Sequence, residues 1–235
     1  MANAQRIQRT LDSAVGAFQS GNLDGAAELC SNLLQKQPKN HHALHILGAV
    51  RLRQNDPATA LKLLKSALKL DPRNGEILSN LGTAYRMNGD AAPAVEALRK
   101  AVKLNPRNGA VLLNLGNAAV DAGEPEIAIG AYRQLVALQP DHLDARKSLA
   151  RLYQEHSEAA LDRAEFEFIC ERDRTDADPY NRLGVLIAES GDHKSAVEKL
   201  TIAANLAPTD PGIRINLANV LALNFDVDQV TSLYE

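Results

Sequence analysis

The chain has 235 residues, of which 45% are apolar and 4% aromatic, it contains no tryptophan, and its net charge is −3. This composition excludes a disordered chain and predicts a core of aliphatic residues that favour helices. The slightly acidic balance also argues against nucleic acid as a partner, because a phosphate backbone demands a basic surface.

The sequence shows neither the apolar leader of a secreted protein nor the long apolar stretch of a membrane protein. The first residues, MANAQRIQRTLDSAV, contain no continuous apolar run, so we expect no secretory signal. No window approaches the roughly 18 apolar residues that cross a bilayer. We therefore expect a soluble, cytoplasmic chain with no membrane partner. Cys30 and Cys170 lie on apolar sides of helical stretches and are expected to act as small reduced hydrophobic residues. A disulfide or catalytic thiol is the less favoured alternative, since no cysteine motif surrounds them.

A 34-residue period organises the whole chain. The stretches ALKLDPRN (67–74) and AVKLNPRN (101–108) lie one period apart and differ at two of eight positions. Prolines recur at the same interval, at Pro38, Pro72, Pro106 and Pro140, and again two periods later at Pro208. When each proline is placed at position 32 of a unit, the units begin at Ile7, His41, Gly75, Gly109, Leu143, Ala177 and Pro211. Such a period is typical of stacked repeats.

Within each unit the pattern predicts two helices. Position 8 always carries a residue with almost no side chain, namely Ala14, Gly48, Gly82, Gly116, Ala150, Gly184 and Ala218. A glycine follows at position 15 in four units (Gly21, Gly89, Gly123 and Gly191), with Asn22, Asp90, Glu124 or Asp192 directly after it. Asn55–Asp56 replaces this pair in the second unit. We expect the glycine to end one helix and the polar residue to help start the next. The small residues at position 20 and the proline at position 32 complete a helix–turn–helix in which small residues mark close helix packing.

These residues resemble the tetratricopeptide repeat family. The resemblance rests on Leu–Gly at positions 7–8, Ala at 20, an aliphatic residue or Ala at 27 and Pro at 32, as in LSNLGTAYRMNGDAAPAVEALRKAVKLNP and LLNLGNAAVDAGEPEIAIGAYRQLVALQP. It implies an all-α fold, a right-handed superhelical solenoid of stacked antiparallel helix pairs. The expected organisation is a lead-in (1–6), units one to four (7–142), an irregular unit five (143–176), unit six (177–210) and a truncated unit seven (211–235).

The fifth unit departs from the family pattern. Asp162 stands where a small residue is expected, and Arg174 stands where proline is expected. Phe166 and Ile169 still occupy apolar positions 24 and 27, so a helix is expected. Two interpretations stay open: a degenerate unit that still stacks, or a kink or subdomain break between residues 157 and 176.

No catalytic motif is present, since the chain lacks GxGxxG, GxxxxGK[ST], HExxH and GxSxG. We therefore expect no enzyme activity within this chain and no cofactor. The one cluster of metal-ligand residues is HHALH, in which His41 and His42 share a helix face with His45. A metal site needs three or four ligands, and no Cys or carboxylate motif completes this one. Residues that line a groove are the favoured interpretation of these histidines.

The resemblance implies that positions 2, 5, 6, 9, 12 and 13 of each unit line an inner groove. Asparagine recurs there although it is unfavourable inside a helix, which suggests that the groove requires amides. An amide offers a donor and an acceptor to the backbone of an extended peptide. The ladder formed by Asn80, Asn114 and Asn216 resembles that of O-linked N-acetylglucosamine transferases. The predicted peptide-binding residues are Asn80, Asn114, Asn117, Asn181, Arg182, Asn216, Asn219, Arg86, Lys147, Arg151, His42 and His45. The alternative is that these asparagines are merely solvated.

The leading interpretation is a non-catalytic scaffold that binds a protein or an extended peptide. The Lys, Asn and Arg set with which related repeats grip the C-terminal carboxylates of heat-shock chaperones is not found in any three successive units. The chain stops at TSLYE, within the seventh unit, so the alternative function is the substrate-recognition arm of a larger glycosyl- or sulfotransferase. A homo-oligomer that forms through exposed terminal units is a third hypothesis.

Overall fold

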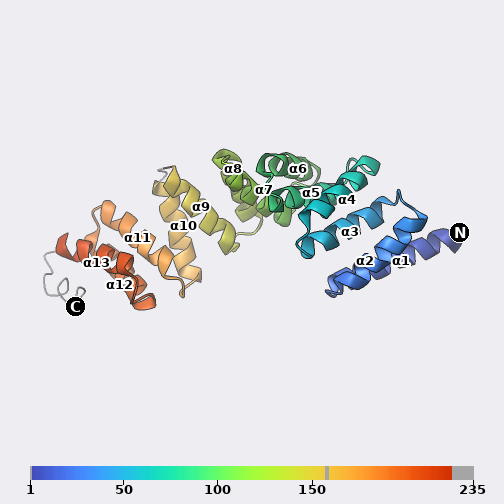
Figure 1. Cartoon of the computed structure of the whole chain (residues 1–235). Coiled ribbons are helices and arrows are strands. Elements are labelled where there is room, and N and C mark those ends of the chain that lie inside the picture. The colour runs from blue at the N-terminus through green and yellow to red at the C-terminus, as the bar shows by residue number, and fades with distance from the viewer. Residues whose placement is uncertain (1, 157–158, 224–235) are drawn as a thin grey trace. The chain divides into compact units, whose positions relative to one another are not determined.

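The computed structural model describes residues 2–156 and 159–223 (Figure 1). Over these residues the chain forms thirteen α-helices and no strand. The first eight are α1 (Ala2–Gln19), α2 (Leu23–Lys36), α3 (His41–Arg53), α4 (Pro57–Leu70), α5 (Gly75–Met87), α6 (Ala91–Leu104), α7 (Gly109–Asp121) and α8 (Pro125–Leu138). The remaining five are α9 (Leu143–Glu155), α10 (Ala159–Arg172), α11 (Ala177–Glu189), α12 (His193–Leu206) and α13 (Pro211–Leu223). The predicted all-α architecture is confirmed. None of the described helices is both long and apolar enough to cross a membrane.

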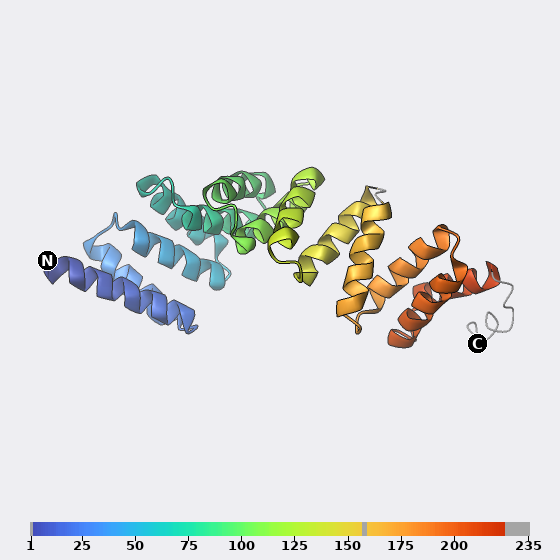
Figure 2. The ribbon, with the colours of Figure 1, turned by 180° about the vertical axis from the view of Figure 1, so that it is seen from behind.

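Consecutive helices pack as pairs, and the pairs stack on one another. In both views α3 lies beside α4, and α11 lies beside α12 (Figures 1 and 2). Five even-numbered helices also pack against the odd-numbered helix of the next repeat, in the pairs α2–α3, α4–α5, α6–α7, α10–α11 and α12–α13. The predicted solenoid of helix pairs is therefore confirmed over the described residues. The second helix that was expected in the seventh repeat, with Val230 at its small position, lies outside these residues.

The contacts divide the chain into two larger parts, residues 1–140 and 141–235. From here on these parts are called the first and the second unit, and each 34-residue stretch is called a repeat. The division falls directly before the irregular fifth repeat. The subdomain break that one of the two open interpretations placed between residues 157 and 176 stays a prediction. So does a kink in that segment, and residues 157–158 lie outside the described part.

Glycine and short polar residues end and start the helices largely as predicted. The position-15 glycines have positive φ angles, +82° at Gly21, +84° at Gly89, +68° at Gly123 and +90° at Gly191, and Asn55 replaces them with φ of 59°. The left-handed region is cheap for glycine and tolerable for asparagine, so it ends the helix here. Asn22, Asp56 and Asp192 each accept a hydrogen bond from the backbone N–H three residues later. Asp90 and Glu124 hold the same position without such a bond.

The small residues at position 8 are buried against position 24 of the same repeat. A Cβ on Gly48 would lie 2.7 Å from Leu64 Cγ, one on Gly82 2.4 Å from Leu98 Cγ, and one on Gly184 2.6 Å from Leu200 Cγ. Where position 8 is alanine, at Ala14, the residue at position 24 is the smaller Cys30. In these repeats the two positions share one volume, and glycine stands where its partner is a large leucine. The fifth repeat departs from this rule, because Ala150 stands at position 8 and the large Phe166 at position 24.

The two cysteines belong to this packing. Cys30 and Cys170 are buried and free, and burial raises the pKa of each thiol to about 11. Both thiols are therefore protonated near neutral pH, and the prediction that they act as small hydrophobic residues is confirmed.

Candidate functional site

The odd-numbered helices share one face of each unit. In the first unit α1 contacts α3, α3 contacts α5 and α5 contacts α7, and in the second unit α11 contacts α13. Among the described residues, the even-numbered helices make no comparable contacts with one another. We call the surface that the odd-numbered helices share the inner face of its unit. All twelve predicted site residues lie on these helices. Helices α3, α5 and α7 carry His42, His45, Asn80, Arg86, Asn114 and Asn117, and helices α9, α11 and α13 carry Lys147, Arg151, Asn181, Arg182, Asn216 and Asn219.

Position-6 asparagines connect three odd-numbered helices, α5, α7 and α13, to the odd-numbered helix before each of them. The Nδ2 atom of Asn80 lies 2.8 Å from Nε2 of His45. Asn114 donates from Nδ2 to Oγ1 of Thr83 over 3.4 Å, and Asn216 donates from Nδ2 to Oδ1 of Asn181 over 2.9 Å. All three asparagines are half-buried. Each thus commits one N–H to the preceding helix, and its Oδ1 makes no hydrogen bond to a described residue.

Asn117 is held by a residue of α8, the second helix of its own repeat, and not by the preceding odd-numbered helix. The hydroxyl of Tyr132 on α8 donates to Oδ1 of Asn117 over 2.6 Å, and Tyr132 is itself 1% exposed. The ring reaches this position by passing Gly116, where a Cβ would lie 2.4 Å from Tyr132 Cε1. The bond leaves both Nδ2 hydrogens of Asn117 available. Asn114 and Asn117, one helical turn apart on α7, therefore offer a free acceptor and free donors side by side.

The predicted basic residues are paired with carboxylates of their own unit. Arg86 lies 3.3 Å from Asp121 Oδ2, and Lys147 donates to Asp176 over 2.6 Å and to Asp173 over 3.2 Å. The bond to Asp176 is the largest of the contacts that raise the pKa of the Lys147 ammonium. Arg151 and Arg182 face a carboxylate four residues away on their own helices, at 4.0 Å from Glu155 and 3.8 Å from Asp178. Each of the four predicted basic residues therefore lies close to at least one carboxylate.

A pocket opens on the second inner face. It has a volume of about 310 Å³ and is lined by Lys147, Ser148, Arg151, Gln154, Phe166, Asp176, Asp178, Pro179 and Arg182. It lies between α9 and α11, which make no contact comparable with those of the pairs α1–α3, α3–α5, α5–α7 and α11–α13. The odd-numbered helix of the irregular fifth repeat, α9, is therefore held apart from α11, the odd-numbered helix of the sixth.

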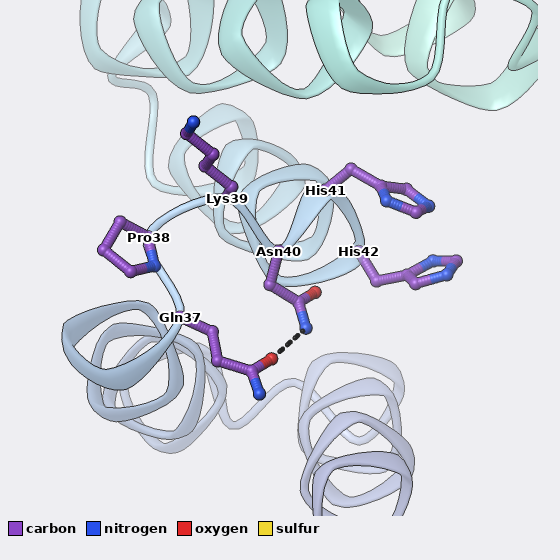
Figure 3. Close-up of a pocket in the computed structure, with 6 residues that line it drawn as sticks. All are labelled: Gln37, Pro38, Lys39, Asn40, His41 and His42. Atoms are coloured by element: carbon purple, nitrogen blue, oxygen red, sulfur yellow. Dashed lines mark hydrogen bonds between the residues drawn. The ribbon is translucent and has the colours of Figure 1, made fainter. Parts of the chain in front are cut away.

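The histidine cluster lies at the start of α3, beside a second cavity. This cavity, of about 520 Å³, is lined by residues 37–42, and His41 and His42 point to the same side of it (Figure 3). Their ring centroids are 3.9 Å apart, and His41 Nε2 lies 3.9 Å from Asp71 Oδ2. In the described part of the chain no three His, Cys, Asp or Glu side chains are grouped so that they could hold a metal ion.

Comparison with known proteins settles the family. A family model described as Tetratricopeptide repeat matches residues 47–109 and 113–177, more than half of the chain. The chain belongs to the tetratricopeptide repeat family. The resemblance found in the sequence is thereby confirmed, and repeats of this family serve protein interaction.

Solved tetratricopeptide repeat structures share the fold. PilF of Pseudomonas aeruginosa superposes with a TM-score of 0.72 at 20% identity, over 93% of this chain and 100% of that one. YrrB, described as a TPR protein with an unusual peptide-binding site, gives 0.71 at 21% identity, over 80% and 97%. MamA gives 0.63 at 26% identity, over 67% and 92%. A search among curated proteins found no match.

Sequence reasoning missed the residues that hold the amides. Tyr132 and Thr83 are the clearest cases. A signal was present, because Tyr132 stands at position 24, where Leu64, Leu98 and Leu200 stand in other repeats. A polar atom at a buried position predicts a hydrogen-bond partner.

We expect Tyr132→Phe to lower the free energy of unfolding by about 0.5–1.5 kcal/mol, because it removes the donor to Asn117 and leaves the packing intact. Urea denaturation followed by circular dichroism measures this loss. Tyr85→Phe is the matched control, since the Tyr85 hydroxyl donates to no described residue. Equal losses from both variants would show that the Tyr132–Asn117 bond contributes nothing.

Proposed function

We propose that the chain is a non-catalytic scaffold whose first inner face binds an extended peptide segment of a partner protein. The observation that carries the proposal is the set of half-buried amides on α5 and α7 with unused hydrogen-bonding atoms. Asn80 and Asn114 have a free Oδ1, and Asn117 has a free Nδ2. A carboxamide that is already held on one side loses less conformational entropy when it binds a ligand on the other, because its orientation is already set.

The chemistry of this face favours recognition of the peptide main chain. Free Oδ1 atoms accept from backbone N–H groups, and free Nδ2 atoms donate to backbone carbonyls. Arg86 is paired with Asp121, so its guanidinium is not free to select an acidic side chain. The partner is therefore expected to be an extended, polar segment that is read mainly through its backbone.

The test begins with a peptide selected against the full chain from a random library of about 12 residues, long enough when extended to span roughly 40 Å. We expect Asn114→Ala to weaken binding of that peptide about five- to tenfold, the worth of one or two hydrogen bonds. Asn32→Ala, an exposed asparagine on the outer helix α2, is the matched control and is expected to leave the affinity unchanged. Isothermal titration calorimetry measures both.

Two outcomes would contradict the proposal. If Asn114→Ala lowers the melting temperature but leaves the peptide affinity unchanged, the amides only fasten successive repeats. If N-methylation of single peptide bonds in the ligand never weakens binding, the face does not read the main chain. The recognition arm of a larger transferase, a cytoplasmic location and self-association through terminal repeats stay predictions that no described residue favours.

A further inference from the structure

The contact between His45 and Asn80 joins a titratable group to an amide of the proposed binding face. His45 on α3 and Asn80 on α5 are both half-buried, and Nε2 of the imidazole lies 2.8 Å from Nδ2 of the carboxamide. A carboxamide nitrogen carries only donor hydrogens, so Nε2 must accept. The imidazole is therefore neutral in this arrangement and carries its proton on Nδ1.

We propose that His45 sets the direction of the Asn80 carboxamide and thereby the hydrogen-bonding polarity of the first inner face. With neutral His45, Asn80 Nδ2 donates to Nε2, and Oδ1 is the atom that a bound peptide meets. When His45 takes a proton from solvent, Nε2 becomes a donor, and the carboxamide turns by about half a rotation so that Oδ1 accepts. Nδ2 then meets the peptide. This inference rests on the proposed function and names His45 as a positioning residue for it.

The consequence is a change in ligand preference with pH. The neutral state offers an acceptor to a backbone N–H, whereas the protonated state presents donors to the same atom. A peptide bound through that N–H would be repelled, because two donors cannot satisfy each other. At Asn114 the corresponding partner is Thr83, whose hydroxyl does not titrate in this range. Asn114 is therefore an internal reference that keeps its direction.

The charged groups around His45 place the change on the acid side of neutrality. Burial lowers the pKa of His45 most, Glu76 on α5 raises it, and His42 and His41 lower it further. Asp71, at the end of α4, lies 3.9 Å from His41 and acts on His42. None of the charged residues described on α1 acts on His45. Because the pKa is lowered below its ordinary value, the neutral state is the one present at pH 7.

Nuclear magnetic resonance of the ¹⁵N-labelled full chain tests the inference without any ligand. At pH 7.5 the imidazole nitrogen shifts of His45 should report the Nδ1–H tautomer. As the pH is lowered, the side-chain amide signals of Asn80 should move with the same midpoint as His45, while those of Asn114 should not. The inference would be overturned by an Nε2–H tautomer at pH 7.5. It would also be overturned if the Asn80 signals did not change while His45 titrates.

His45→Gln supplies the variant arm, since glutamine keeps a polar partner that does not titrate. In this variant the pH response of the Asn80 amide should vanish, and persistence of that response would overturn the inference. The library-selected peptide should bind wild type about fivefold more weakly at pH 5 than at pH 7.5, the worth of one hydrogen bond, and should bind His45→Gln equally at both. A chain that shows the expected titration but binds no library peptide overturns the proposed function and not this inference.

Discussion

Gly116→Ala is expected to lower the free energy of unfolding of the first unit by about 1–3 kcal/mol, the usual cost of overpacking a filled core. The added Cβ would lie 2.4 Å from Cε1 and 2.6 Å from Cζ of Tyr132. The Tyr132 ring is buried and rigid, so it cannot retreat as the end of a flexible side chain could. The ring must shift as a whole, and its hydroxyl is then expected to leave Asn117.

Gly130→Ala is the matched control, because it places the same methyl group on α8 of the same repeat. A Cβ at Gly130 meets nothing within 4 Å. With no clash, the helix propensity of alanine should raise the free energy of unfolding by up to about 1 kcal/mol. Urea denaturation followed by circular dichroism gives both values, and hydrogen exchange localises them to α7 and α8. Variants that change stability by the same amount and sign would show that glycine at position 8 is not a packing requirement.

A rescue experiment tests the shared volume directly. The first repeat pairs Ala14 with Cys30 at the positions that Gly116 and Tyr132 occupy in the fourth. Tyr132→Cys should therefore reduce the cost of Gly116→Ala, so that the double variant loses less stability than the two single variants together. Strict additivity would contradict this account.

The architecture could be predicted from the sequence because its determinants repeat. Gly82 and Gly116 stand one period apart and each faces a large residue at position 24, so one local rule, applied several times, specifies the helix pairs and their stacking. The period also placed the ends of most helices, because glycine at position 15 has few alternatives to a left-handed turn.

The site could be predicted only in part. The period placed Asn80 and His45 on adjacent inner helices, but the contact between them depends on how far α5 is displaced along α3. That displacement is set by packing and has no sequence signature. The same holds for Lys147, whose bonds to Asp173 and Asp176 bridge from α9 to the end of α10 and the start of α11. Sequence reasoning treated it as a groove cation available to a ligand, whereas the structure shows it paired.

Asp162→Ala is expected to raise the free energy of unfolding of the second unit by about 1–3 kcal/mol at pH 7.5. Asp162 is 2% exposed, and its Oδ1 has no hydrogen-bond partner among the described residues. Burial is the main cause that raises the pKa of this carboxyl to about 6, while Arg182 lowers it and Glu189 raises it. An ionised carboxylate in such a place destabilises the fold, and alanine occupies this position in five other repeats.

The pH dependence of this gain has a definite sign. The folded state holds the Asp162 proton more tightly than the unfolded chain, whose carboxyl has the ordinary value of 3.8. Wild-type stability should therefore be highest relative to Asp162→Ala below about pH 4 and fall as the pH rises toward about 6. Asp162→Asn, which cannot ionise, should lose this dependence.

Asp173→Asn is the contrasting control in the same unit. Hydrogen bonds from Thr175 are the main cause that lowers the pKa of Asp173, with Lys147 adding to them. The stabilisation from Asp173 is thus present above its ordinary pKa and lost as the pH falls, so its replacement should destabilise the unit at pH 7.5 and matter less in acid. Denaturation series of the wild type and the three variants between pH 2 and 7.5 separate the two signs. A difference between wild type and Asp162→Ala that does not change across this range would show that the Asp162 carboxyl is not shifted by its burial.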